Sequence, residues 1–512
     1  MSEAQPKMSE IRHTKKMEKE WYIQIRSKIK DLIRATEWEG HVFCVGGCVR
    51  DEIMGNEIKD IDLVVDLPNG GIRFADWMRG CGFTNGETVT YPTYGTAMFR
   101  LKDFPDAELE CVQTRGRKAT DATRRNPETA FGSITEDCLL RDLTINALYH
   151  NVTTDQLLDL TQKGIDDIRN HVVRTTTDPD IIFGDDPLRI LRCIRFATRY
   201  GWEIEPQTYD GMKRNAGRLD IVAKERVREE LDKMLTGRCP VRAIRLLSEA
   251  GAMQYVIPEL EDTYAMTQNQ YHFGTVWEHT LKVLDNVKDD RLEVRMAALL
   301  HDIGKIATRE ETSEGKVRFL HHEAASADLV DVILRRLKYS NEFICKVRFL
   351  VQHHMDCKAW QDDLSMMKAK RLRKLQYECK TEERFKDLML LVDADNKAHA
   401  ENYCLEHQAD LILQRTGQMK QEGAALFGYT LPFTGKEIME LKGLTPGPTV
   451  KECLEYLLKL AYVSPLRSKE EWTKHLLGYR VKNDLIDKEI FVQASAEPNL
   501  FELCRAQPKI TK

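Results

Sequence analysis

An α/β head followed by a long all-α body is the fold class that this chain of 512 residues predicts. Strand-like runs rich in apolar and β-branched residues occur early, at 42–46, 61–66, 96–101 and 108–114. Past about residue 135 the strand signal fades, and apolar residues recur at helical spacing to the C-terminus. Strands at one end and helices at the other indicate a small mixed sheet joined to a helical body.

The helices follow from local periodicity in the same way. An amphipathic helix is expected over 21–37, before the first strand, whereas residues 1 to 20 are polar and mixed in charge. No repeat or low-complexity tract interrupts the order. Further helices are expected at 186–200, 222–236, 241–250, 276–288, 293–301, 324–338, 342–354 and 383–395.

The composition is that of an ordinary soluble protein. Hydrophobic residues make up 42% of the chain and charged residues 31%, and its length suits about three or four domains with separate cores. No apolar run is long enough to span a bilayer, and the N-terminus lacks a signal-peptide pattern, so no membrane partner is expected. Thirteen cysteines without a C-x-x-C pair predict reduced thiols and a cytoplasmic location.

A pair of glycines opens the first candidate site. The stretch Phe43-Cys-Val-Gly-Gly-Cys-Val-Arg-Asp51 runs from an apolar segment into a turn at Gly46 and Gly47. Glycines there let backbone N–H groups approach a phosphate closely, and Arg50 can pair with it. A Gly-Gly pair alone is most often only a turn, and the full G-x-G-x-x-G spacing of dinucleotide sites is absent.

Two aspartates follow this turn at strand spacing. Asp60 and Asp62 lie where the second strand begins, and the alternation of a strand puts both carboxylates on one face. Adjacent carboxylates repel each other unless a cation lies between them, and Mg²⁺ prefers carboxylate oxygens. Glycines, an arginine and then paired aspartates therefore predict a polymerase-like nucleotidyl transfer site that uses Mg²⁺.

Basic residues cluster in two segments of the sequence. The net charge of −5 by itself does not indicate whether the chain binds nucleic acid, so local clustering is the informative feature. One group recurs at helical spacing directly after Asp185-Asp186-Pro187, so that a helix would carry it as one stripe. A solvated helix face is the plain alternative, but the acidic pair beside the stripe favours a binding role. The first cluster comprises Arg115, Arg117, Lys118, Arg124 and Arg125, and the stripe comprises Arg189, Arg192, Arg195 and Arg199.

These motifs resemble the class II tRNA nucleotidyltransferases (CCA-adding enzymes) and the related bacterial poly(A) polymerases, over roughly residues 40 to 260. The resemblance implies a polymerase β-like head. It also implies that the turn binds phosphate, that the aspartates bind Mg²⁺, and that a further carboxylate and an arginine lie nearby. The residues that carry this part are Gly46, Gly47, Arg50, Asp51, Asp60, Asp62, Glu110 and Arg115.

A second segment, Glu136-Asp-Cys-Leu-Leu-Arg-Asp-Leu-Thr-Ile-Asn146, resembles the family's Arg-Arg-Asp-Phe-Thr-Ile-Asn-Ala motif, which contacts sugar and triphosphate. Here Leu140 stands in place of the first arginine and Leu143 in place of the phenylalanine. Part of the family's contact with the triphosphate or sugar is therefore in question. The residues carried over are Arg141, Asp142 and Asn146.

The stripe resembles the family's base-reading helix, in which an aspartate and an arginine replace a nucleic-acid template. Asp186 and Arg189 are one helical turn apart, so that the carboxylate accepts from the amino group of cytosine or adenine while the guanidinium donates to the base. The resemblance adds Arg192 and Arg195 to the nucleotide-binding set. Glu225-Arg-Val-Arg-Glu-Glu-Leu231 matches the next helix, in which Arg226 and Arg228 are implied RNA contacts.

The second half of the chain carries an independent order of histidines and aspartates that resembles the HD superfamily of metal-dependent phosphohydrolases. Neutral imidazoles and carboxylates suit a divalent transition metal or Mg²⁺. An isolated His-Asp pair is usually only a hydrogen bond at a helix end. The implied ligands are His279, His301, Asp302 and Asp395, with His322 and His354 for a second ion and with His321, His353 and Asp393 as neighbouring alternatives.

Five segments are expected: an N-terminal extension (1–35), the nucleotidyltransferase head (36–170), a helical neck that binds base and RNA (171–260), an HD domain (261–400) and a helical tail (401–512). In the tail, 433–439 and 444–450 resemble bacterial members of the family. A Pro-Gly-Pro helix start there could grip tRNA or simply begin a helix.

The resemblance implies that the chain adds C, C and A to tRNA from CTP and ATP. For the HD domain it leaves two alternatives: hydrolysis of a phosphoester, or a helical domain, with or without metal, that mainly positions tRNA. A poly(A) polymerase or an A-adding enzyme of the same family is the nearest alternative. The absence of basic residues from Gly86 to Met98 favours CCA addition over poly(A) synthesis. An alternative of another class is an HD phosphohydrolase whose head only binds RNA.

Overall fold

The computed structural model describes residues 19–92, 95–117, 129–272, 274–360, 363, 367–427, 431–463 and 468–480. The described residues fall into two compact units, one within 1–355 and 390–404 and the other within 356–389 and 405–512. Lys118, Arg124 and Arg125 of the first basic cluster lie outside the described residues.

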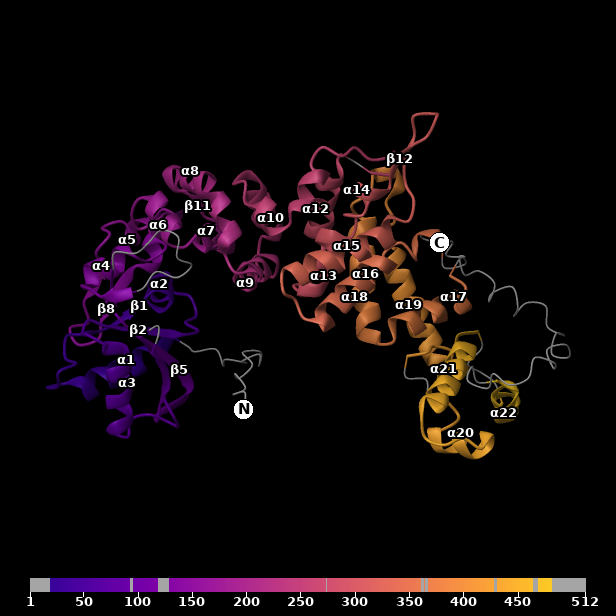
Figure 1. Ribbon diagram of the computed structural model, residues 1–512, viewed down its shortest axis with the longest axis horizontal. Helices are drawn as coiled ribbons and strands as arrows, with labels where there is room; N and C mark the ends of the chain where they lie inside the picture. Colours follow the sequence, from indigo (N-terminus) through magenta and orange to yellow (C-terminus); the bar gives the residue numbers. More distant parts are fainter. Residues whose placement is uncertain are drawn as a thin grey trace. The chain divides into compact units, whose positions relative to one another are not determined.

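A seven-stranded mixed sheet forms the head (Figure 1). β2 and β5 are parallel, whereas the other neighbouring strands are antiparallel. All four predicted strands are confirmed. In order across the sheet the strands are β3 (Val89–Tyr91), β4 (Thr96–Leu101), β5 (Phe104–Gln113), β2 (Ile61–Val65), β1 (Val42–Val45), β8 (Leu148–Asn151) and β9 (Leu157–Asp159).

The expectation that strands end near residue 135 is wrong, because β8 and β9 extend the sheet beyond β1. All four residues of β8 are buried, so the strand has no solvent-exposed face, and its apolar and polar residues do not alternate. Within the described ranges, three short strand pairs, one in the head and two in the helical body, were also not predicted from the periodicity. They are β6 (Arg115–Arg117) with β7 (Thr129–Phe131), β10 (Val172–Val173) with β11 (Glu203–Ile204), and β12 (Arg309–Glu311) with β13 (Val317–Phe319).

Three helices complete the head: α1 (Lys19–Ile33), α2 (Gly47–Met54) and α3 (Gly70–Gly80). α1 ends earlier than the predicted residue 37. Ala35 takes a positive φ of 57°, and the Thr36 hydroxyl donates to the Ile33 carbonyl oxygen over 2.6 Å, which closes the last turn. α2 begins directly where β1 ends, and this junction forms the Gly-Gly turn.

The other predicted helices are confirmed to within about three residues. α7 begins at Leu188, not at the predicted 186, because Asp186 is extended (φ −148°, ψ 102°). α4 (Ile134–Leu139) and α5 (Gly164–Arg169) lie within the expected head, and the neck contains α6 (Pro179–Asp185), α7 (Leu188–Tyr200), α8 (Pro206–Asn215), α9 (Lys224–Leu235), α10 (Pro240–Glu249) and α11 (Met253–Val256). Next come α12 (Val276–Asn286), α13 (Leu292–Leu300), α14 (Lys305–Thr308), α15 (His322–Arg336), α16 (Asn341–His353) and α18 (Glu382–Asn396).

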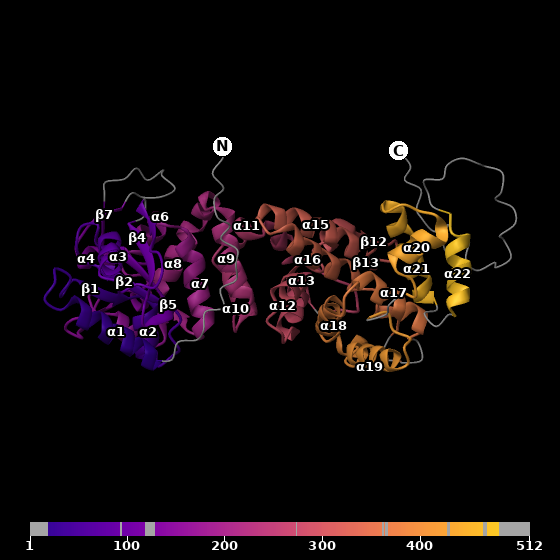
Figure 2. The same cartoon turned by 90° about the horizontal axis from the view of Figure 1, so that it is seen from below.

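The second unit has its own apolar core, in which Trp472, Leu457 and Ile438 are buried. Its helices α20, α21 and α22 lie side by side in Figures 1 and 2. Among the described residues, no helix combines the length and apolar character needed to cross a membrane. The helices of this unit are α17 (Ala369–Cys379), α19 (Gln408–Gln421), α20 (Gly435–Lys442), α21 (Pro448–Val463) and α22 (Lys469–Gly478).

Candidate active site

The pairing of β2 with β5 brings two carboxylates together. In this parallel ladder Asp62 lies opposite Glu110, so both side chains emerge on the same face of the sheet. Asp60 immediately precedes β2 and is exposed. Burial, followed by the charge of Glu110, raises the pKa of Asp62 to about 6, and burial and Asp60 raise the pKa of Glu110. Because these acids oppose each other's ionisation, the cluster fits a bound cation.

The glycine turn lies directly against this acidic pair. Gly46 has a φ of +75°, which favours glycine. A Cβ added at Gly46 would lie 3.6 Å from Asp62 Oδ2 and 3.9 Å from Arg141 Nη1. The backbone of the turn, a carboxylate and a guanidinium therefore meet at one point. The absence of a side chain keeps the space between them open.

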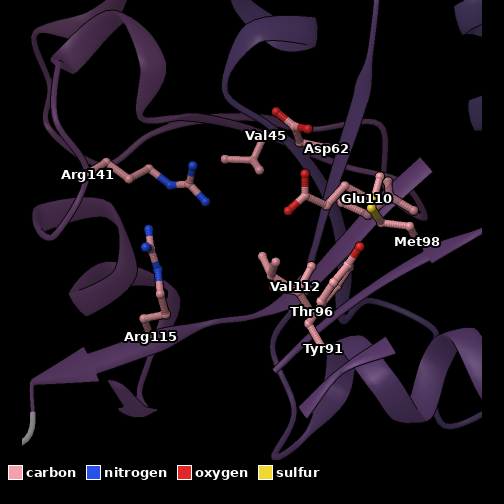
Figure 3. Close-up of a pocket in the computed structure, with 10 residues that line it drawn as sticks. Val45, Asp62, Tyr91, Thr96, Met98, Glu110, Val112, Arg115 and Arg141 are labelled. Atoms are coloured by element: carbon pink, nitrogen blue, oxygen red, sulfur yellow. The ribbon is translucent and has the colours of Figure 1, made fainter. Parts of the chain in front are cut away.

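Two cavities adjoin each other at Arg115 and Arg141, which line both. Figure 3 shows the carboxylates of Asp62 and Glu110 on one side of the larger cavity and the two guanidinium groups on the opposite side. The larger cavity (≈ 680 Å³) is lined by Val45, Asp62, Leu63, Tyr91, Thr96, Met98, Glu110, Val112, Arg115 and Arg141. The smaller cavity (≈ 270 Å³) is lined by Arg115, Arg141, Asp142, Asp186, Leu188, Arg189, Arg192 and Arg226.

Asp137 holds both shared arginines, and the sequence reasoning missed it. Its fully buried carboxylate accepts from Arg115 Nε (3.0 Å), Arg141 Nε (3.0 Å) and the Tyr149 hydroxyl (2.7 Å). Burial opposes ionisation, but Arg141 and Arg115 outweigh it and lower the pKa of Asp137 to about 2. The spacing of four residues from Asp137 to Arg141 on α4 and its following turn was the available signal.

A hydrogen-bond chain connects the back of the glycine turn to the base-reading helix. Arg50 Nη1 donates to Asn146 Oδ1 (2.5 Å), Asn146 Nδ2 donates to Asp142 Oδ1 (3.2 Å), and Asp142 pairs with Arg192 (2.6 Å). Burial acts against the ionised form of Asp142, but Arg192 and Arg189 hold its pKa well below the usual range. These charge-assisted hydrogen bonds hold Asp142 and Arg192, which line the smaller cavity, in fixed positions.

The predicted base-reading pair lies at the start of α7, where Asp186 and Arg189 line the smaller cavity. Arg226 of α9 donates to both carboxylate oxygens of Asp186, over 2.7 and 3.3 Å. Arg189 Nη2 donates to the Leu140 carbonyl oxygen over 2.7 Å. Groups from α9 and from the segment after α4 therefore orient the two reading side chains.

Three arginines predicted as nucleotide or RNA contacts line neither of these cavities. Arg50 is 4% exposed and paired with Asp51 and Asn146. Arg195 donates to Glu230 over 2.5 Å, and Arg228 donates to the Lys338 carbonyl oxygen. The helical stripe thus divides: Arg189 and Arg192 face the cavity, whereas the next arginine is part of the packing between α7 and α9. Spacing along one helix cannot show which partner the next helix offers.

Six residues converge in a second centre, formed by α12, α13, α15, α16 and α18 and the turns that end them. Asp302 is at its middle: its oxygens lie 3.2 Å from His301 Nε2 and 3.2 Å from His322 Nε2. His279 Nε2 is 3.2 Å from Asp395 Oδ1. The ligand atoms form two sets of metal-binding spacing, namely His279, His301 and Asp395, and Asp302, His322 and His354.

Three histidines of this centre direct Nε2 towards the other ligand atoms, and burial keeps two histidines neutral. His301, His322 and His354 each place Nδ1 against a backbone carbonyl oxygen three residues earlier, at 2.9, 2.9 and 2.6 Å. A carbonyl only accepts, so Nδ1 carries the hydrogen and Nε2 presents its lone pair to the centre. Burial lowers the pKa of His279 to about 4 and that of His354 to about 3, so both are neutral at pH 7.

The neighbouring alternatives do not face this centre. The side chain of His321 is 88% exposed, Asp393 pairs with Lys397 over 2.7 Å, and His353 packs on Phe349. Adjacent positions on a helix differ by about 100° in direction, which separates Asp393 from Asp395 and His353 from His354. His321 instead precedes α15 with a positive φ of 59°, so its side chain leaves the backbone in a different direction from that of His322.

Sequence reasoning missed two further residues of this centre. Lys305 is 2% exposed, and its Nζ lies 2.7 Å from Asp302 Oδ2. The His272 ring lies 4.6 Å from that of His279, and His272 joins His279 and Asp302 at metal-binding spacing. Gly304 precedes the lysine because a Cβ there would lie 2.3 Å from the backbone nitrogen of Ser326. This close approach brings α15, and with it His322, to the centre.

Comparison with known families identifies three matching domains. Residues 42–174 match the poly A polymerase head domain, 201–263 the probable RNA and SrmB-binding site of polymerase A, and 270–396 the HD domain. These matches follow the chain in the order head, neck and second centre.

Curated relatives align with this chain over most of their own length. The multifunctional CCA protein of Paraburkholderia phymatum is 30% identical over 321 residues, 59% of this chain and 71% of the relative. The A-adding tRNA nucleotidyltransferase of Deinococcus radiodurans is 29% identical over 83% of this chain and 93% of its own. The CC-adding tRNA nucleotidyltransferase of Thermus thermophilus is 28% identical over 86% and 93%.

Among solved structures, the Bacillus stearothermophilus CCA-adding enzyme in complex with CTP has the same fold. Its TM-score is 0.59 at 19% identity, over 89% of this chain and 96% of that one.

Proposed function

The chain belongs to the CCA-adding tRNA nucleotidyltransferase family, and we propose that it adds C, C and A to the 3′ end of tRNA from CTP and ATP. One observation carries the proposal. The acidic pair Asp62 and Glu110 and the reading pair Asp186 and Arg189 line adjoining cavities that share Arg115 and Arg141. A nucleoside triphosphate needs these three groups: acids for a metal at the reacting phosphate, cations for the triphosphate and a polar edge for the base.

Each side chain then has a role that follows from its place. Asp60, Asp62 and Glu110 would hold Mg²⁺, which would supply positive charge for attack by the tRNA 3′-hydroxyl on the α-phosphate and for the leaving pyrophosphate. Arg115 and Arg141 neutralise the triphosphate from the opposite wall.

The nucleotide pocket is lined by Asp142 and Arg192, which form an ion pair, and Asn146 donates a hydrogen bond to Asp142. Arg50 donates to Asn146 and so stabilises this group without lining the pocket. Asp186 and Arg189 read the base. The functional limits proposed are 36–170 for the head, 171–260 for the neck and 261–400 for the HD domain.

The test is incorporation of labelled CTP and ATP, separately and together, into a tRNA transcript that ends at the discriminator base. Addition of two C residues and then one A is expected, and Asp62→Ala is expected to abolish it. Addition of A alone, of C alone or of an unbounded A tract would move the chain to the A-adding enzymes, the CC-adding enzymes or the poly(A) polymerases. Incorporation that survives Asp62→Ala would refute the assigned site.

A second activity, hydrolysis of a phosphoester by the HD domain, is favoured by the convergence of His279, His301, Asp302, His322, His354 and Asp395. These ligands suit a divalent transition metal or Mg²⁺, which would activate water. Metal content and hydrolysis of p-nitrophenyl phosphate and of 2′,3′-cyclic AMP test the proposal. The double variant His301→Ala with Asp302→Ala is expected to lose both. Hydrolysis that survives it would belong to another site. The cysteines in the described part of the chain form no disulfide, which supports the proposed cytoplasmic location.

A further inference from the structure

The reading aspartate has most of its hydrogen-bonding capacity occupied by the protein. Asp186 Oδ1 accepts from the Leu188 N–H (3.1 Å) and from Arg226 Nη1 (3.3 Å), and its Oδ2 accepts from Arg226 Nη2 (2.7 Å). A carboxylate offers about four acceptor positions, so about one remains, and it belongs to Oδ2. Arg226 therefore limits what Asp186 can accept from a base.

The reading arginine is restricted in a matching way. Its Nη2 donates to the Leu140 carbonyl oxygen, whereas its Nη1 is buried and has no hydrogen-bond partner among the described residues. A buried donor without a partner favours any ligand that accepts from it. Arg189 and Asp186 line the same cavity, so the protein presents one acceptor and one unused donor there.

We propose that Arg226 is a positioning residue that determines which base is accepted. It holds Asp186 in place and occupies two of its acceptor positions. Only a base with one amino donor beside one ring acceptor then fits. The inference rests on the proposed nucleotidyl transfer. Cytosine (N4–H beside N3) and adenine (N6–H beside N1) offer this edge. Uracil and guanine offer a carbonyl oxygen beside an N–H, which places acceptor against acceptor and donor against donor.

Loss of Arg226 has a specific consequence for guanine. Without Arg226, the carboxylate of Asp186 regains an acceptor position on each oxygen, because only the Leu188 N–H still donates to Oδ1. Guanine presents two adjacent donors, N1–H and N2–H, that a carboxylate with an open position on each oxygen binds in parallel. Uracil has a single donor and gains less. The expected error is therefore mainly incorporation of GMP in place of CMP.

The experiment measures kcat/KM for CTP, UTP and GTP on a tRNA ending at the discriminator base, for the wild type and for Arg226→Met, Arg226→Lys and Arg214→Met. Arg214 is the matched control, because it forms an exposed pair with Asp180 (3.1 Å) on the same neck, away from both cavities. The unfolding midpoint of each variant checks folding.

In Arg226→Met the ratio of GTP to CTP is expected to rise at least about fivefold, which corresponds to ~1 kcal/mol. Arg226→Lys should keep part of the discrimination, and Arg214→Met should leave it unchanged. An unchanged ratio overturns the inference, whether incorporation falls equally for all nucleotides or stays at the wild-type level.

If the wild type incorporates neither CTP nor ATP, the proposed function fails separately. Calorimetric binding of CTP and GTP to the same variants then decides the inference. A preference for CTP that weakens in Arg226→Met supports it, and a preference that does not change refutes it.

Discussion

Replacing Asp137 by asparagine should disable the nucleotide site without touching any group that contacts the nucleotide. The carboxylate accepts from Arg115, Arg141 and Tyr149 at 2.7–3.0 Å and is fully buried. An asparagine has the same shape but carries an amide group whose N–H donors would face the guanidinium donors. Both arginines would then be free to leave the positions they share between the two cavities.

The stability that the Asp137 carboxylate contributes follows from its pKa, which lies at about 2 in the folded chain instead of 3.8. This difference corresponds to about 2 kcal/mol of stability at neutral pH. Because the folded-state pKa is depressed, this stability is present in full above the unfolded value near 4 and is lost as the pH falls through about 2. The gap in stability between wild type and Asp137→Asn should therefore be constant between about pH 5 and 8.

Calorimetric unfolding at several pH values and steady-state incorporation of CTP form the assay. We expect a lower unfolding midpoint for the head and a fall in kcat/KM for CTP of at least about tenfold, because the triphosphate would have to reorder two arginines. Wild-type stability together with wild-type kcat/KM would refute the reasoning. A loss of stability with unchanged kcat/KM would show that Asp137 supports the fold but not the arginines' role.

Three further outcomes follow from the same geometry. Gly46→Ala puts a Cβ at a φ of +75° and 3.6 Å from Asp62 Oδ2. The head should lose about 1–2 kcal/mol of stability, and incorporation of CTP should fall at least about tenfold. Unchanged kinetics would contradict the need for glycine in this turn. His301→Ala with Asp302→Ala should leave CTP incorporation within about twofold of the wild type while metal is lost, since the residues of the two sites are separate; equal loss of both activities would show coupling. Treatment of the purified protein with a chelator should lower the unfolding midpoint of the HD domain but not that of Asp302→Ala, and an equal shift in both would place the stabilising metal elsewhere.

The order of helices and strands was largely readable from the sequence, because it depends on local periodicity. The α7 and α15 patterns show which residues recur on one face, and that face is buried in the structure. β8 was not readable, since a four-residue strand buried on both faces has no alternation. The positions of its neighbours in the sheet, β1 and β9, supply the missing information.

The candidate sites were readable only in part. Acids at strand spacing and histidines in a family-like order indicate the chemistry, because metal and phosphate sites need particular residue types. The same patterns could not distinguish His322 from His321, or separate the cavity-facing Arg192 from the packed Arg195. Each of these choices depends on a side chain from another element.

The sequence by itself determined the kinds of groups available: a glycine turn, paired carboxylates, a reading aspartate and arginine, and an ordered set of histidines. Only the tertiary structure decided their partners. Asp137 between two arginines, Arg226 on Asp186 and the Leu140 carbonyl on Arg189 join residues that lie up to 49 positions apart. A hydrogen bond acts over about 3 Å, and distance along the chain says nothing about distance in space until the chain has folded.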